Sequence, residues 1–220
     1  MKSKILGLLA VPLLLASSQA SANLLSNAGF EDPITFDGPP FTGSWEGFRT
    51  GDGASADASA ANSASSPRTG LQSALLILNN KPLAFAGVAQ DVSGVTAGTS
   101  YTFSGWHLAG SSPFDVGVEI RIEWRASGSN TEIDRTPNLT PIPLLAYSEF
   151  SLSAMAPVGA DVARVVYAIQ SFSTNPLGNG RVFVDDLSFD ASVPAVPEPG
   201  TLALLSLGLA GLGLSRCRKA

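Results

Sequence analysis

Short segments in which hydrophobic and polar residues alternate recur along most of this chain, and helical spacing is absent. In the clearest one, Val118–Arg125 (VEIRIEWR), apolar side chains alternate with glutamate and arginine. In a second, Ser100–Leu108, Tyr101 and Phe103 alternate with polar residues and Trp106. Five further segments are predicted as strands: 73–78, 85–92, 148–152, 163–172 and 181–189. Separated by turn-forming residues, these segments predict an all-β sandwich.

Two stretches between the predicted strands lack this periodicity. Residues 51–67 are rich in Ala, Ser, Asp and Gly and offer nothing to bury, so they are predicted as a flexible loop or a poorly ordered strand connection. Residues 127–143 contain three prolines and are predicted to cross an edge of the sandwich. Strand alternation places Trp124 and Tyr167 in the core, whereas Trp45 fits either the core or the surface.

The N-terminus has the features of a secretory signal peptide. Lys2 and Lys4 precede an apolar run, residues 5–16, and the small residues 20–22 (ASA) form a cleavage site. We therefore predict a signal peptide over residues 1–22, a β-domain over 23–190 and a linker over 191–196.

The C-terminus, residues 197–220, has a different composition from the domain. It begins with Pro197, Glu198 and Pro199 and continues with an apolar stretch, Leu202–Leu214. At about 1.5 Å per residue this stretch spans roughly 20 Å, less than the roughly 30 Å of a bilayer core. A cationic cluster follows, which favours a short transmembrane helix with a cytoplasmic end. Its members are Arg216, Arg218 and Lys219.

This order of a Pro-Glu-Pro motif, a short membrane helix and a basic end resembles the PEP-CTERM sorting signal of Gram-negative bacteria. The resemblance implies that the tail is a substrate of an exosortase and a transient anchor in the inner membrane. It also implies delivery to the cell surface, the outer membrane or an extracellular matrix formed with exopolysaccharide.

Charge and cysteine content argue against several classes of function for the domain. The whole chain has a net charge of −5, but five of its 13 basic residues lie at the two ends. Residues 23–196 hold eight basic and 17 acidic side chains, a net charge of −9. Such a surface repels nucleic-acid phosphates, which argues against nucleic-acid binding. The only cysteine, Cys217, lies in the tail, so the domain has no disulfide and no thiol chemistry.

Three segments of the domain resemble the carbohydrate-binding modules of families 4 and 9, which are galactose-binding-like jelly rolls. They are NLLSNAGFE (23–31), VAQDVSGVTAGTSYTFSGW (88–106) and VFVDDLSF (182–189). The resemblance implies a jelly-roll β-sandwich, with a fibronectin-like sandwich as the alternative because periodicity does not give strand order. In the resembled family, a glutamate and an aspartate equivalent to Glu31 and Asp186 hold a structural calcium ion. Alternation places Asp185 and Asp186 on opposite faces, so one of them is the expected ligand; the alternative is that both are solvated turn residues.

The candidate sugar-binding residues are Trp106, Glu119, Arg121 and Glu123. If the two strands that carry them pair, the ring of Trp106 lies beside carboxylate and guanidinium groups that can form hydrogen bonds with sugar hydroxyls. Gln170, from the segment 163–172, can be a further member of this site. The alternative is that the ring is covered by a loop and the charges are cross-strand ion pairs of a solvated sheet.

Catalysis is not expected. His107 is the only histidine, no nucleophile motif accompanies it, and no spacing selects a carboxylate pair. The sequence therefore predicts an exported, non-enzymatic jelly roll that contacts polysaccharide in an exopolysaccharide or biofilm matrix. The alternatives are a purely structural matrix protein without a ligand and an uncharacterised carbohydrate-active enzyme.

Overall fold

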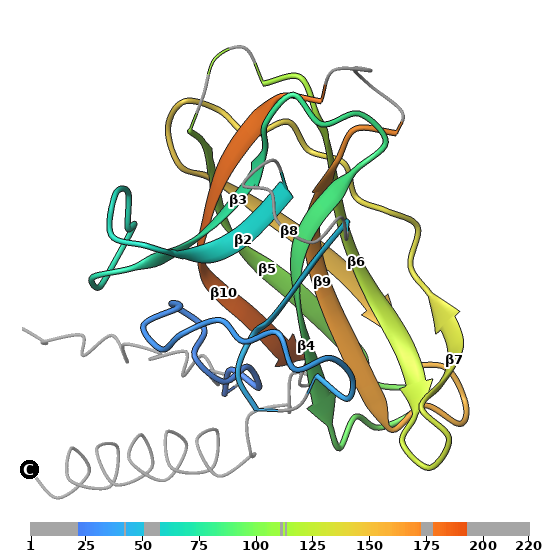
Figure 1. Ribbon diagram of the computed structural model, residues 1–220. Helices are drawn as coiled ribbons and strands as arrows, with labels where there is room; N and C mark the ends of the chain where they lie inside the picture. The colour runs from blue at the N-terminus through green and yellow to red at the C-terminus, as the bar shows by residue number, and fades with distance from the viewer. Residues whose placement is uncertain are drawn as a thin grey trace, which may run out of the picture. The chain divides into compact units, whose positions relative to one another are not determined.

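The part of the chain that the structure describes contains ten β-strands, joined by loops, and no helix (Figure 1). This computed structural model describes residues 22–41, 43–50, 58–110, 112, 114–172 and 178–192. The strands are β1 (Glu46–Arg49), β2 (Ala58–Ser63), β3 (Ser73–Leu78), β4 (Phe85–Ser93), β5 (Ser100–Ala109), β6 (Gly117–Ala126), β7 (Thr131–Arg135), β8 (Ser148–Met155), β9 (Val162–Gln170) and β10 (Gly180–Ala191). All of them belong to one compact unit, residues 21–192.

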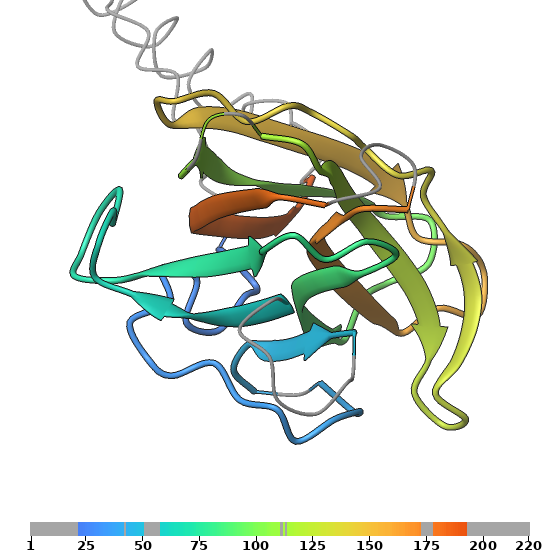
Figure 2. The same cartoon turned by 45° about the horizontal axis from the view of Figure 1, so that its top comes forward.

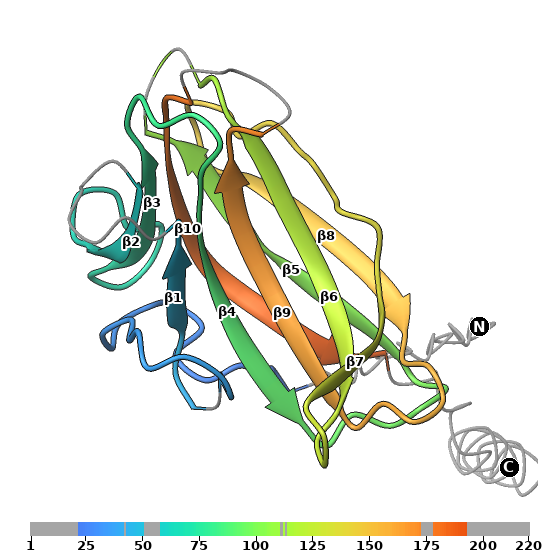
Figure 3. The same ribbon diagram turned by 45° about the vertical axis from the view of Figure 1, so that its right-hand side comes forward.

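The strands form two antiparallel sheets of five strands each. Sheet A has the order β1-β4-β9-β6-β7, and sheet B has the order β2-β3-β10-β5-β8. Figure 3 shows the strands of sheet A side by side, with those of sheet B behind them. The connection between β2 and β3, residues 64–72, extends from the side of the sandwich (Figure 2). The predicted all-β sandwich is confirmed.

The core lies between the sheets and is built by the predicted alternation. In β6 the apolar set that begins at Val118 points inward, and in β5 Tyr101 and Phe103 do the same. Trp124 and Tyr167 are fully buried, as predicted, and Trp45 is also part of the core. Aromatic rings fill much of the space, because each buries a large apolar area.

The first described residues pack along the last strand. The amide of Leu24 donates to the carbonyl of Phe189 at 2.9 Å, and the side chain of Asn23 donates to the carbonyl of Leu187 at 2.8 Å. The indole of Trp45 donates to the carbonyl of Asn27 at 3.0 Å. The two ends of the domain are therefore adjacent in space, as the family resemblance implies for Glu31 and Asp186.

The structure corrects the predicted loop over residues 51–67. Its second part forms β2, in which Ala58 and Ala60 are buried. Alanine and serine form this strand because pairing with β3 and packing on the core decide its structure, whereas their intrinsic strand preference is low. Residues 127–143 do follow an edge, and they contribute β7 at the margin of sheet A.

Candidate functional site

Trp106 and the charged residues of β6 lie on different sheets. β5 pairs with β10 and β8, whereas β6 pairs with β9 and β7. The expectation that Trp106 lies beside Glu119, Arg121 and Glu123 is therefore wrong. Side-chain alternation was predicted correctly, but the pairing of strands depends on the topology of the whole domain. Trp106 instead lies beneath Arg68, whose guanidinium carbon is 3.9 Å from the centre of the indole ring.

A groove crosses four strands on the outer face of sheet A. We call it the sheet A groove, and its volume is about 310 Å³. Its lining comes from β1, β4, β9 and β6 and from a residue two positions after the end of β9: Phe48, Phe85, Ala168, Gln170, Glu119, Arg121 and Phe172. Four neighbouring strands spaced by about 4.8 Å give it a length of roughly 14 Å across the sheet. The structure thus brings Glu119, Arg121 and Gln170 together as predicted, without Trp106.

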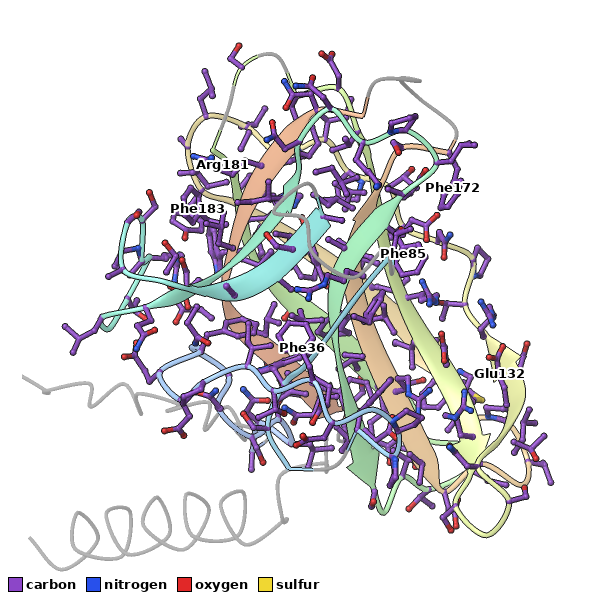
Figure 4. All side chains as sticks on the ribbon, viewed as in Figure 1. Phe36, Phe85, Glu132, Phe172, Arg181 and Phe183 are labelled. Atoms are coloured by element: carbon purple, nitrogen blue, oxygen red, sulfur yellow. The ribbon has the colours of Figure 1, made fainter. Side chains whose placement is uncertain are left out.

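Three phenylalanines form the aromatic part of the sheet A groove. The ring centres of Phe48 and Phe85 are 5.9 Å apart, and those of Phe85 and Phe172 are 6.4 Å apart. Phe172 is 56% exposed, so much of this apolar surface is open to solvent. Figure 4 shows Phe85 and Phe172 close together at one side of the sandwich, whereas Phe183 and Arg181 lie at the other.

The floor of the groove is flat because its residues are small. A Cβ atom on Gly87 would lie 2.4 Å from the ring of Phe48 and 2.8 Å from the Cβ of Ala168. Only glycine at this position allows Phe48 to pack directly onto the sheet, where it covers the small residues of β4 and β9.

Charged side chains form the β6 end of the groove. Arg121 donates through Nε to Glu123 at 2.8 Å, and its Nη1 lies 3.5 Å from Glu119. Arg125 bonds the other oxygen of Glu123 at 3.1 Å. Two carboxylates therefore hold the guanidinium of Arg121 in one orientation. These ion pairs run along β6 itself; across strands, Nη1 of Arg125 lies 3.6 Å from Glu132 of β7, as the alternative interpretation expects.

The middle of the outer face is closed by the segment before β1. Arg164 makes a two-pronged ion pair with Asp91, with N–O distances of 2.6 and 2.9 Å, and its guanidinium lies 4.3 Å from the centre of the Phe41 ring. The amide of Asp91 donates to the carbonyl of Phe41 at 2.6 Å. Beyond this contact lies a second cavity of about 250 Å³, lined by polar groups that include Arg125 and Asn130.

Phe48, Phe85 and Phe172 were missed by sequence reasoning. Phe85 and Phe172 lie at the ends of two segments that were predicted as strands. Alternation places Phe85 on the same face as Gly87, and it places Phe172 on the same face as Ala168, the partner of Gly87. Alternation could therefore have identified Phe85 and Phe172 from the sequence. Phe48 was not recognisable, because β1 has only four residues and no alternating pattern.

The predicted calcium ligands face the β2–β3 connection. Glu31 accepts hydrogen bonds from the amides of Leu71 and Gln72 at 2.8 and 3.2 Å. Asp185 is fully buried, and its burial raises the pKa of its carboxyl group. The expectation that Asp185 and Asp186 point to opposite faces is wrong, because both contact this connection. A bulge between 185 and 188 and a φ of 49° at Asp186 break the alternation.

The carboxylates do not converge as a metal site requires. Among the residues that the structure describes, no three histidine, cysteine, aspartate or glutamate side chains are placed to hold a metal ion. The oxygens of Glu31, Asp185 and Asp186 are directed at N–H and O–H donors of residues 68–72 and at one backbone amide of β10. These residues do not fit a calcium ion in this arrangement, and the calcium site stays a prediction.

The single histidine lies in the core. Nδ1 of His107 is 2.8 Å from the hydroxyl of Tyr167, and both side chains are buried. Burial lowers the pKa of His107 to about 4. The two polar atoms satisfy each other between the sheets, which is a structural role.

The predicted terminal features fall outside the described residues. These are the signal peptide over 1–22 (apart from Ala22), Pro197, Glu198, Pro199, the apolar stretch Leu202–Leu214 and the basic residues Arg216, Arg218 and Lys219. Over the described part of the chain, no helix has the length and hydropathy needed to cross a membrane.

Solved structures share the fold of this domain at low sequence identity. The enzymatically active domain of bacteriophage CBA120 tailspike protein 4 is 14% identical with a TM-score of 0.57; the match covers 77% of this chain and only 21% of the tailspike. The CBM22-1 xylan-binding domain of Paenibacillus barcinonensis Xyn10C is 13% identical over 81% of this chain and 100% of its own, with a TM-score of 0.51. A Stig cyclase, Fisc from Fischerella sp. TAU, is 18% identical over 79% and 98%, with a TM-score of 0.54. The predicted jelly-roll sandwich is thereby confirmed.

Comparison with curated protein sequences finds no match. Two family models do match. The PEP-CTERM protein-sorting motif covers residues 195–219. The carbohydrate binding domain of families 4 and 9 covers residues 22–141, more than half of the 220 residues. Both predicted resemblances are confirmed: the chain belongs to the family 4 and 9 carbohydrate binding domains, and it carries a C-terminal PEP-CTERM protein-sorting motif.

Proposed function

We propose that this protein is exported and binds polysaccharide in the sheet A groove without catalysing a reaction. The observation that carries the proposal is the groove itself, in which an exposed aromatic surface faces an oriented arginine across four strands. Membership of a carbohydrate binding domain family supports it, as does the fold shared with a xylan-binding domain.

The geometry suits a chain of sugar rings. The ring of Phe172 offers an apolar surface for the apolar face of a sugar, and Phe85 and Phe48 continue that surface across the sheet. Arg121 presents donors at the opposite end, and Glu119 presents acceptors for hydroxyl groups. The ion pairs restrict the motion of Arg121 before ligand binds, so little side-chain entropy is lost on binding.

The sorting motif supports delivery to the cell envelope. We propose that an exosortase recognises Pro197, Glu198 and Pro199, while Leu202–Leu214 and the basic end anchor the precursor transiently in the inner membrane. The domain then reaches the cell surface or an exopolysaccharide matrix. In cells, replacing the three motif residues with alanine is expected to leave full-length protein in the membrane fraction.

Affinity electrophoresis through gels that contain xylan or other neutral polysaccharides tests the binding site. We expect Phe172→Ala and Arg121→Ala each to weaken retardation by at least about tenfold in Kd, or ~1.4 kcal/mol. Trp106→Ala on sheet B is the matched control and should bind as the wild type does.

The alternatives give different results in the same experiment. A structural matrix protein predicts no retardation of any variant by any polysaccharide. Binding that is lost in Trp106→Ala and kept in Phe172→Ala would move the site to sheet B. Turnover of a polysaccharide that one Asp or Glu substitution abolishes would identify an enzyme.

A further inference from the structure

The β2–β3 connection is fastened to the sandwich by negatively charged side chains. The amides of Arg68 and Thr69 donate to Asp185 at 2.7 and 3.3 Å, and those of Leu71 and Gln72 donate to Glu31. Successive amides that point at one anion form a small anion-binding nest. The connection thus supplies four amide donors to carboxylates from the first and last segments of the domain.

Amide donors do not cancel the charge of the cluster. Glu31, Asp185 and Asp186 all contact the connection, and Asp185 is fully buried. Burial and the neighbouring charge of Asp186 raise the pKa of Asp185, because adjacent carboxylates repel one another unless a positive charge lies beside them.

Arg68 places that positive charge at the cluster. Its Nη1 lies 2.5 Å from Oδ2 of Asp186, and the hydroxyl of Thr69 bonds the other oxygen of the same carboxylate. The guanidinium also stacks 3.9 Å above Trp106, which shields it from water on one side. A single side chain therefore ties the connection to β10 and to β5.

We propose that Arg68 is the built-in cation of this carboxylate cluster, so that the connection is held in place without a bound metal ion. The carboxylate oxygens already accept bonds from the connection, and the guanidinium neutralises the carboxylate of Asp186, whose side chain is 25% exposed. This assignment differs from the calcium ion that the family resemblance implies, and it does not depend on polysaccharide binding. It also places a cation against one face of the Trp106 ring, so that this face is not free to stack on a sugar.

Thermal unfolding of the full chain in a mild detergent tests the proposal. We expect the wild-type Tm to be the same in EDTA and in millimolar calcium. Arg68→Gln removes the charge and the stacking, and should lower Tm by about 2–4 °C. Arg181→Gln, at an exposed arginine on the same face of sheet B, is the matched control and should leave Tm unchanged.

Tryptophan fluorescence gives a second readout. Trp45 and Trp124 are fully buried, so Trp106 is the ring that a substitution of Arg68 exposes. We expect Arg68→Gln to shift the emission to the red and to increase quenching by acrylamide, and Trp106→Phe to remove both changes. If Arg68→Gln does not fold, Arg68→Lys keeps the charge and should retain the wild-type response to calcium and EDTA.

Two results would overturn the proposal. One is a wild-type Tm that rises with calcium and loses that rise in Glu31→Ala, because a metal ion would then be the cation of the cluster. The other is an Arg68→Gln protein that matches Arg181→Gln in both Tm and acrylamide quenching.

Discussion

Single residues in this domain decide whether the outer face of sheet A can act as a binding surface. Gly87 and Ala168 keep the floor of the groove flat, and Phe172 supplies its most exposed ring. Between the sheets, His107 and Tyr167 satisfy each other's polar atoms.

Gly87→Ala is expected to disturb both stability and binding. The new methyl group would lie 2.4 Å from the Phe48 ring and 2.8 Å from the carbonyl oxygen of Tyr167, so the ring must move off the sheet. Overpacking of this kind costs about 1–3 kcal/mol. Gly128→Ala is the control, since no atom lies within 4 Å of its added Cβ. Equal urea midpoints and equal xylan retardation for the two variants would contradict this account of the groove floor.

His107 makes the stability of the domain depend on acidity. Burial lowers its pKa from the ordinary value of 6.5 to about 4, so the unfolded chain binds a proton more readily than the folded one. Stability should therefore fall as pH drops from 6.5 to about 4, by up to roughly 1.4 kcal/mol per pH unit, and level off below that.

Urea unfolding at a series of pH values measures this contribution. The control is His107→Gln, which has no titrating group at this position. Its unfolding free energy should lack the part of the decrease between pH 6.5 and about 4 that comes from the histidine. If the unfolding free energies of both proteins change equally with pH over this range, the histidine does not contribute to the pH dependence of stability.

At the scale of elements, pairing between strands carries the information that the sequence lacks. The bounds of β3 coincide with the predicted segment, those of β5 differ by one residue at one end and those of β6 by one residue at each end, because alternation is a local property. β2 was predicted as a loop since its alanines become core residues only when it pairs with β3. Trp106 was assigned to the wrong neighbours for the same reason, although Glu119, Arg121 and Gln170 do meet.

The contact between β4 and β9 contains a buried ion pair. Arg164 and Asp91 are an ion pair whose side chains are only 10% and 3% exposed. Arg164→Met leaves the buried Asp91 without its cationic partner, although the amide of Phe41 still donates to it at 3.2 Å. The unpaired charge is expected to cost about 3–5 kcal/mol of unfolding free energy. It also removes the surface on which Phe41 rests.

A double-mutant cycle separates the pair from its surroundings. Arg164→Met combined with Asp91→Leu should recover much of the lost stability, because no unpaired charge remains. If the double variant is as unstable as the sum of the two single ones, the two side chains are not coupled.

At the scale of the whole molecule, an acidic sandwich is joined to a sorting motif. Residues 23–196 carry a net charge of −9, which favours solubility outside the cell and leaves neutral polymers as the partners that its charge does not repel. The sheet A groove, which we propose as the binding site, lies apart from the carboxylate cluster, Arg68 and Trp106, which gather on the side of sheet B. The proposed binding site and the contacts that attach the two domain ends therefore use different parts of the fold.

The most direct test of polysaccharide binding is isothermal titration of the protein with exopolysaccharide from the producing cells. The account predicts saturable heat for the wild type and for Trp106→Ala, and none for Phe85→Ala combined with Phe172→Ala. Saturable binding that survives in that double variant, or no heat in any of the three proteins, would contradict it.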